Sequence, residues 1–397
     1  MRVTLTAITA LSLSACGGSD SGQALAEPVI DTLGNGVIQV TNSGPTAWAD
    51  TNGWKIVLER EIRPEEGSPG ELSGGNRIVA DAAGNIYVMQ RSPVRIAVFG
   101  PDGQWLRDLG REGDGPGEFR DGMLGIVGDT LFVQDPNNSR LTTFLTDGTP
   151  IASYPSQCCY FFSRLTVLAN GRVMIPGPPP DDQSTAAHYL TRLDGTVTDT
   201  LLVPSYGPID QNSDDYWMVA RRSAQSSSIR TVSIPFRASD MSVVRPDGRV
   251  VSGRSDNYRL VIGNDFVDTT LIINASAPTI AVSDAQRDSA YHATLDGMSD
   301  DWKEAFEEEA KLSDLPNQWP VWTAMGTDRD NNIWVSLPGD RGGHTTLQVF
   351  NPDGVLLGDV PGVGMNLFNG YWTNDRIYLA SEDEDGYPII RVFRIMK

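Results

Sequence analysis

The sequence predicts an all-β fold, a six-bladed β-propeller of four-stranded antiparallel blades with a helical insertion and a ring closed by an N-terminal strand. A turn followed by a short apolar or β-branched run recurs six times along the chain. Each run is followed by a second strand-like run and, in most cases, by an Asp-Gly turn. Once two long insertions are set aside, the repeat is about 45 residues, the length of a four-stranded propeller blade.

The first residues predict export. Residues 3–13 form a mildly apolar run that is too short to cross a bilayer, which needs about 20 helical residues, so we interpret residues 1–15 as a signal peptide. Residues 13–16, Leu-Ser-Ala-Cys, resemble the lipobox of bacterial lipoproteins. That resemblance implies cleavage before Cys16 and acylation of its thiol, which would make Cys16 the lipid-attachment residue. A plain secretory signal with a chance cysteine is the alternative.

The rest of the chain divides into a tether and a folded part. Residues 16–53 are rich in Gly and Ser and are expected to form a flexible tether. Residues 54–397 are expected to form the propeller. No later segment contains the roughly 18 consecutive apolar residues that a transmembrane helix requires, so the lipid anchor is the expected membrane contact.

Six runs carry the repeat, and each begins at a turn. Asx-Gly turns supply the positive φ angles that tight hairpin connections need, so each run and its successor are predicted to pair as a hairpin. The six runs are residues 84–90, 128–134, 171–177, 248–253, 331–337 and 375–381.

Two gaps in the repeat are long, and we interpret them as insertions at about residues 205–238 and 276–320. The first insertion is polar and irregular. The second is predicted to be helical, because Ser283 and Gln286 have capping-box spacing and Ser299 marks a second helix start.

An echo near the N-terminus predicts how the ring closes. Residues 54–72 repeat the pattern of residues 105–119, which end a blade. The blade that the first copy ends is the last one, whose chain stops at Lys397 after three strands. Residues 54–61 are therefore predicted to supply its outer strand, which removes an open sheet edge.

Residues 113–119, GDGPGEF, followed by residues 134–148, QDPNNSRLTTFLTDG, resemble an NHL repeat. The whole mature chain resembles the bacterial six-bladed β-propeller lipoproteins. The resemblance implies the fold and a lipid-anchored place in the cell envelope, periplasmic or surface-facing, and implies little about chemistry. The fourth blade departs from the pattern, because it lacks the GPGEF connection and the Asn-x-x-Arg turn.

Charge and motif content exclude several functions. The chain has 51 acidic and 31 basic residues and a net charge of −20, which disfavours nucleic acid and anionic membrane surfaces as partners. His188, His292 and His344 lack the spacing of metal ligands, and no GxSxG-type nucleophile elbow is present. We therefore assign no catalytic residue and favour a non-enzymatic protein, expected to be a monomer.

One face of the propeller is predicted to bind partners. Loops that join the second strand to the third, and the outer strand to the next blade, emerge on the same face, and both insertions lie there. We expect this face to contact a protein, peptide or glycan. Its candidate residues are Arg91, Asn137, Asn138, Asp256, Trp302, Glu382 and Asp383. The alternative for Asn138 is that it holds a turn together with Asp135 and Arg140.

A second function hypothesis is a calcium-dependent, lactonase-like hydrolase with its site at the channel mouth, as in propellers related to NHL repeats. Such a site needs several carboxylate or amide oxygens around one ion. The acidic run 382–385 is one candidate. Asp328, Asp330 and Asn332 resemble the start of a calcium loop, but the required Gly and distant Glu are missing, which favours turn chemistry. No other cofactor is expected, and a quinone-dependent dehydrogenase rests on fold analogy alone.

Cys158 and Cys159 are adjacent in a chain that is predicted to be exported, where thiols tend to oxidise. Neighbouring Cα atoms lie about 3.8 Å apart, closer than the usual disulfide span. A strained disulfide and two buried thiols both remain open.

Overall fold

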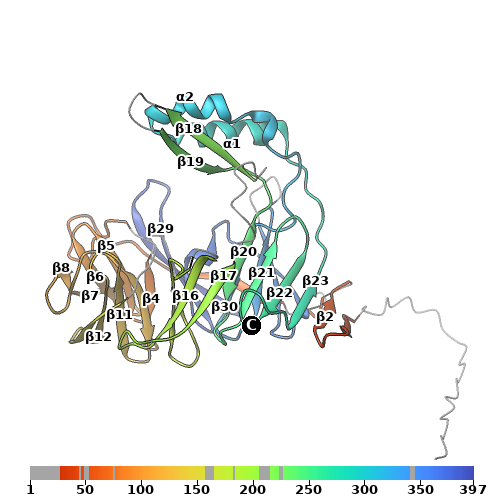
Figure 1. Ribbon diagram of the computed structural model, residues 1–397. Helices are drawn as coiled ribbons and strands as arrows, with labels where there is room; N and C mark the ends of the chain where they lie inside the picture. Colours follow the sequence, from red (N-terminus) through yellow and green to blue (C-terminus); the bar gives the residue numbers. More distant parts are fainter. Residues whose placement is uncertain are drawn as a thin grey trace, which may run out of the picture.

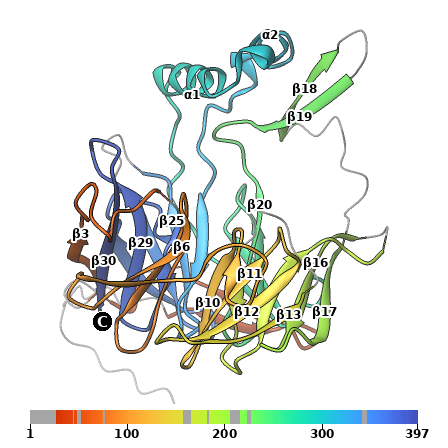
Figure 2. The ribbon, with the colours of Figure 1, turned by 90° about the vertical axis from the view of Figure 1, so that its left-hand side faces the viewer.

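The computed structural model describes residues 27–43, 46–48, 53–74, 77–156, 165–181, 184–204, 215–222, 227–339 and 345–397. Within these residues, six sheets, each with four antiparallel blade strands, surround a common axis and form the predicted six-bladed β-propeller, which Figures 1 and 2 show from two sides. The predicted signal peptide, Cys16 and the Cys158–Cys159 pair lie outside the described residues.

In blades 1 to 5 the four blade strands follow one another in the chain from the innermost outward, and in blade 6 the outer strand comes from the N-terminal side. Blade 1 is β4 (Ile78–Ala80), β5 (Ile86–Arg91), β6 (Val94–Phe99) and β7 (Trp105–Leu109); blade 2 is β10 (Met123–Val127), β11 (Thr130–Asp135), β12 (Arg140–Leu145) and β13 (Pro150–Pro155). Blade 3 is β14 (Thr166–Val167), β15 (Val173–Gly177), β16 (Ser184–Thr191) and β17 (Val197–Pro204); blade 4 contains β20 (Asp240–Val244), β21 (Val250–Arg254), β22 (Arg259–Gly263) and β23 (Leu271–Asn274). Blade 5 is β24 (Ala324–Thr327), β25 (Ile333–Leu337), β26 (Thr346–Phe350) and β27 (Leu356–Pro361). Blade 6 is β28 (Tyr371–Trp372), β29 (Arg376–Glu382), β30 (Pro388–Met396) and β3 (Lys55–Ile62). Two short strands, β8 (Arg111–Glu112) and β9 (Glu118–Phe119), follow blade 1, and the 3-10 helix η2 (Leu367–Asn369) precedes β28.

The core lies between neighbouring blades. Middle strands such as β5 and β25 are almost continuously buried, because a blade covers each of their faces, whereas the outer strand β7 is mostly exposed. One apolar cluster joins blades 4 and 5 and includes Val251, Leu260 and Phe350. This packing between blades fixes the innermost strands around the axis.

The ring is closed by β3, as the sequence predicts. β3 pairs antiparallel with β30 and forms the outer strand of blade 6. Two ion pairs cross this seam, Arg376 with Glu59 at 2.8 Å and Arg391 with Glu61 at 2.9 Å. The start of the propeller is thereby attached to its end, and β30 has a partner on both sides.

The chain ahead of the ring differs from the flexible tether expected over residues 16–53. β1 (Val29–Thr32) and β2 (Ile38–Thr41) form a hairpin, and β2 pairs in parallel with β23. The Asn42 side chain then accepts a hydrogen bond from the backbone N–H of Leu356 at 2.8 Å. Blade 4 therefore has six strands, because pairing satisfies backbone groups that a free tether would leave to water.

The two insertions come together in a small layer that we call the cap. It consists of β18 (Tyr216–Arg222), β19 (Ser227–Ser233), α1 (Asp284–Asp296), α2 (Asp300–Glu309) and the 3-10 helix η1 (Leu312–Asp314). Figures 1 and 2 show it standing over one face of the propeller, which we call the cap face.

The cap has its own apolar core. Trp217 and Phe306 are buried in it and meet edge to face, with ring centroids 5.2 Å apart. The predicted capping box is present, since the Ser283 side chain and Gln286 bond reciprocally at the start of α1. Ser299 precedes α2, as predicted, but makes no side-chain capping bond. The cap is thus a packed unit and not a pair of loose loops.

Candidate functional site

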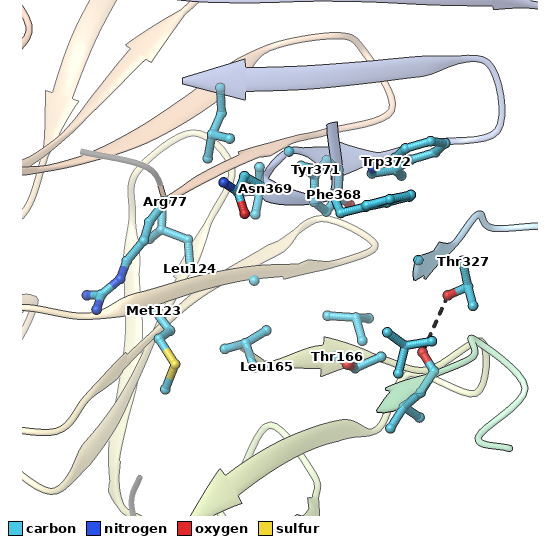
Figure 3. A pocket seen from close by; sticks show the side chains of 18 of the residues that line it. Arg77, Met123, Leu124, Leu165, Thr166, Thr327, Phe368, Asn369, Tyr371 and Trp372 are labelled. Atoms are coloured by element: carbon cyan, nitrogen blue, oxygen red, sulfur yellow. Dashed lines mark hydrogen bonds between the residues drawn. The ribbon is translucent and has the colours of Figure 1, made fainter. Parts of the chain in front are cut away.

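A cavity of about 670 Å³ lies on the propeller axis. All six innermost strands, β4, β10, β14, β20, β24 and β28, contribute to its lining (Figure 3). Because inner strands follow the loops of the cap face, each begins at the cap side of the cavity and ends at its far side. The cavity therefore has two distinct ends. Residues just before an inner strand lie at the cap side, and residues just after it lie at the far side.

The walls combine apolar and aromatic side chains with polar groups. Blade 6 and the η2 segment before it contribute Phe368, Tyr371 and Trp372, and the rings of Phe368 and Trp372 stack with centroids 6.1 Å apart. Gly326 in β24 allows this arrangement, because a Cβ atom there would lie 2.4 Å from the Phe368 ring. In Figure 3 these aromatic side chains face Leu165 and its neighbours across the cavity. The walls can therefore hold a flat or elongated apolar group.

Two arginines and one aspartate form the rim at the cap side. Arg77 donates to Asp121 at 2.8 Å and to the carbonyl oxygen of Gly122 at 2.6 Å. Arg91 approaches the other carboxylate oxygen of Asp121 at 3.0 Å. Burial lowers the pKa of Arg77, and Asp121 opposes that effect. Asp121 thus holds both guanidinium groups at the rim.

Arg329 lies across the far end of the cavity. It follows β24 in blade 5 and donates to the carbonyl oxygens of Val167 in blade 3 at 3.0 Å and Trp372 in blade 6 at 3.2 Å. It also donates to the Tyr371 hydroxyl at 3.2 Å, and its guanidinium lies 5.4 Å from that ring's centroid. One side chain thus connects three blades and occupies the end opposite the cap.

The lining has an unusual charge for this protein. Among the lining residues that the structure describes, Arg77, Arg91 and Arg329 are cationic and none is Asp or Glu, although the chain as a whole has a net charge of −20. His188 in β16 also lines the cavity, and burial lowers its pKa, so it is neutral near pH 7. The charged side chains of the described lining are therefore all cationic, in a protein that is acidic as a whole.

Of the predicted candidate residues, Arg91 alone belongs to the described lining. Asp135 accepts hydrogen bonds from the backbone N–H groups of Asn137 and Asn138, at 2.9 and 3.3 Å. Asn138 also donates to the carbonyl oxygen of Gly113 at 3.2 Å. These contacts match the turn-holding alternative.

The other candidates lie on the cap face or in the cap, away from the cavity lining. Asp256 pairs with Arg254 at 3.2 Å. Asp383, next to Glu382 in the turn between β29 and β30, accepts from the backbone N–H groups of Asp385 and Tyr387 and pairs with Arg63. In the cap, Trp302 lies between the guanidinium groups of Arg221 and Arg230, 5.2 and 4.9 Å from its ring centroid.

Most residues that line the axial cavity could not be predicted from the sequence. Arg77 precedes a three-residue strand, and Phe368 precedes a two-residue strand, which are too short to show a periodic pattern. Arg329 stands in the Asp-rich turn that was weighed as a calcium loop or a hydrogen-bonded turn, and not as part of a cavity. Two of the lining arginines, Arg91 and Arg329, lie next to turns of the repeat, and this position was the sequence signal that could have pointed to the cavity.

Within the described part of the chain, no group of three or more His, Cys, Asp or Glu side chains is arranged to hold a metal ion. The same residues include no helix long and apolar enough to cross a membrane.

No protein-family model matches this sequence, and no curated protein matches it. Several solved structures do. A Bacteroides fragilis protein described as exported shares 9% identity and a TM-score of 0.46, over 91% of this chain and 100% of that one. A duf4221 family member from Bacteroides vulgatus shares 12% identity and a TM-score of 0.41, over 88% and 100%. Virginiamycin B lyase from Staphylococcus aureus shares 11% identity and a TM-score of 0.40, over 87% and 100%.

These likenesses carry no functional argument. The propeller assignment rests on the strand pairing, and the functional argument rests on the cavity.

Proposed function

We propose that this protein is an exported binding module that takes a small ligand, or the end of a larger one, into the axial cavity from the cap side. The observation that supports it is the axial cavity, which all six blades line and whose far end Arg329 crosses. Its volume of about 670 Å³ is within the range of ligand pockets, roughly 300–1,000 Å³. Apolar walls with a few polar groups at the ends are typical of such pockets.

The cap supports the same proposal, because it is tied to the propeller near the cavity mouth. Arg254, at the end of β21, pairs with Asp215 at the start of the β18–β19 hairpin at 2.8 Å. It also pairs with Asp240 at 3.1 Å, in the innermost strand of blade 4. In this proposal the cap forms part of the approach to the cavity.

Attachment to the envelope through Cys16 belongs to the same proposal, and it has a simple test. Replacing Cys16 by Ala removes the acylated thiol, so we expect the protein to move from the membrane fraction to the soluble fraction of a bacterial envelope preparation. Cys16→Ser serves as a second variant, because it too lacks the thiol. Retention of both variants in the membrane fraction would contradict lipid anchoring.

Filling the cavity is expected to abolish binding. Thr166→Trp places an indole in the cavity, and Ile151→Trp places the same group on the exposed outer strand β13, where Ile151 is 50% exposed. Binding is measured by titration calorimetry with three probes that share one aromatic body, 2-naphthoate, 2-naphthylmethanol and 2-naphthylmethylammonium. We expect at least one probe to bind the wild type and the Ile151→Trp variant with one-to-one stoichiometry and not to bind Thr166→Trp.

Far-ultraviolet circular dichroism and melting temperature show whether each variant is folded. If no probe binds the wild type, or if Thr166→Trp is folded and binds as well as the wild type, the proposed function is wrong.

A further inference from the structure

We propose that the ligand of the axial cavity is a small apolar molecule that carries one anionic group, a carboxylate or a phosphate, and that Arg77 and Arg91 at the rim recognise that group. This inference rests on the proposed function and adds the chemical class of the ligand.

The rim has the composition of an anion site. Arg77 and Arg91 meet at Asp121, so two guanidinium groups lie side by side at the rim. The Arg77 side chain is 15% exposed. It donates a hydrogen bond to the carbonyl oxygen of Gly122, just before the innermost strand of blade 2, and this bond fixes its position. The Arg91 side chain is 57% exposed, and a guanidinium has five N–H donors, so it can bond to a ligand while it contacts Asp121. Guanidinium groups are suited to carboxylate and phosphate because their donors are planar and paired.

The far end strengthens the preference for an anion. Arg329 is bonded to two carbonyl oxygens and a phenol, and no carboxylate within the described residues is shown to pair with it. Arg329 therefore places a guanidinium group in the lining at that end. Because the described lining has no Asp or Glu, a cationic ligand would find no complementary group there.

The walls define the rest of the ligand. The stacked Phe368 and Trp372 rings on one side and Met123, Leu124 and Leu165 on the other leave an apolar space between the two arginine-bearing ends. An apolar body that fills this space would bring its charged group to the rim, where Arg91 reaches solvent. The arrangement favours an amphipathic acid over a uniformly polar molecule such as a free sugar.

The three naphthalene probes test this class, because they share one aromatic body and carry an anionic, a neutral or a cationic group at the same ring position. We expect 2-naphthoate to bind the wild type at least about tenfold more tightly than 2-naphthylmethanol or 2-naphthylmethylammonium. Its affinity is expected to fall as salt is raised, since part of the rim is exposed to solvent.

Two variants of opposite effect test the assigned residues. Arg91→Gln removes a cation from the rim and is expected to lower 2-naphthoate affinity by about tenfold. Asp121→Asn removes the competing carboxylate but keeps the oxygen that accepts from the backbone N–H of Gly122, and it is expected to raise 2-naphthoate affinity. The affinity for 2-naphthylmethanol is expected to change little in either variant.

The outcomes separate this inference from the proposed function. Equal binding of the three probes by the wild type, with loss in Thr166→Trp, would preserve the proposed function and overturn the anionic class. If Arg91 serves only to connect blades, Arg91→Gln will lower the melting temperature and leave 2-naphthoate affinity unchanged, and that result would also overturn the inference.

Discussion

A chain that lacks β3 is expected to lose about 3–6 kcal/mol of unfolding free energy relative to a chain that keeps it. Ile56 and Ile62 of β3 are buried, at 8% and 6% exposure, and a buried side chain of this size contributes about 1.5–3 kcal/mol. Loss of β3 also leaves β30 with an unpaired edge. The measurement is urea denaturation of two truncated proteins, one beginning at residue 53 and one at residue 63. Both lack β1 and β2, so the comparison isolates the closing strand.

The ion pair between Arg376 and Glu59 makes the stability contributed by β3 depend on pH. The hydrogen bond from Arg376 lowers the pKa of Glu59 below its ordinary value of 4.5. A carboxyl group with a lowered pKa in the folded state contributes stability above its ordinary pKa and loses it as pH falls through the lowered value. The stability difference between the two truncated proteins is therefore expected to narrow below pH 4.5. Equal urea midpoints at neutral pH would contradict closure by β3.

The closure by β3 could be predicted because the two similar segments, residues 54–72 and 105–119, form similar local structures. In the first copy, the backbone N–H of Gly67 donates to the Glu71 side chain at 2.9 Å. In the second copy, Gly115 donates to Glu118 at 2.8 Å. Both segments follow an outer strand, and in each a glycine N–H bonds to the glutamate of a Pro-Gly-Glu sequence, across four residues in the first copy and three in the second. Similar local turns therefore leave a similar pattern in the sequence. The six blades were predictable for a similar reason, since each repeat begins at a turn that needs particular residues.

The N-terminal hairpin could not be predicted in this way. Ile38–Thr41 pairs in parallel with Leu271–Asn274, more than 200 residues later in the chain, and no local turn relates the two. All four residues of Val29–Thr32 are exposed, so this strand lacks the alternation of buried and exposed residues that identifies a strand in a sequence.

The cavity was hidden for a different reason. Most of its residues come from six inner strands of two to five residues and from positions near their ends, and Arg91 and His188 come from strands further out. They become neighbours only when the ring is complete, and side chains such as Arg77 and Arg329 have no common motif. The net charge of the chain, −20, also gave no indication of a cavity lined by arginines.

The turn that contains Asp328 illustrates how one short pattern can be tested for two functions. Asp328 is 1% exposed. One carboxylate oxygen accepts from the backbone N–H groups of Asp330 and Asn332, at 3.0 and 2.9 Å. The other accepts from the Asn332 side chain at 2.8 Å and from the Trp334 indole at 3.0 Å. Asp81 in blade 1 accepts equivalent bonds from Asn85, so this is a repeated turn and not a feature of one blade.

Replacing Asp328 by Ala is expected to lower the free energy of unfolding by about 3 kcal/mol, since a buried donor left without its acceptor costs about 1–3 kcal/mol and several donors share this carboxylate. Asp328→Asn is the matched variant. It keeps the oxygen that accepts from the two backbone N–H groups but turns an amide toward the Asn332 and Trp334 donors, so its loss should be intermediate. Urea denaturation is run with added calcium and with EDTA, because a calcium loop would respond to the ion and a hydrogen-bonded turn would not. An Asp328→Ala midpoint equal to that of the wild type, or a calcium-dependent difference between the two proteins, would contradict the turn-holding role.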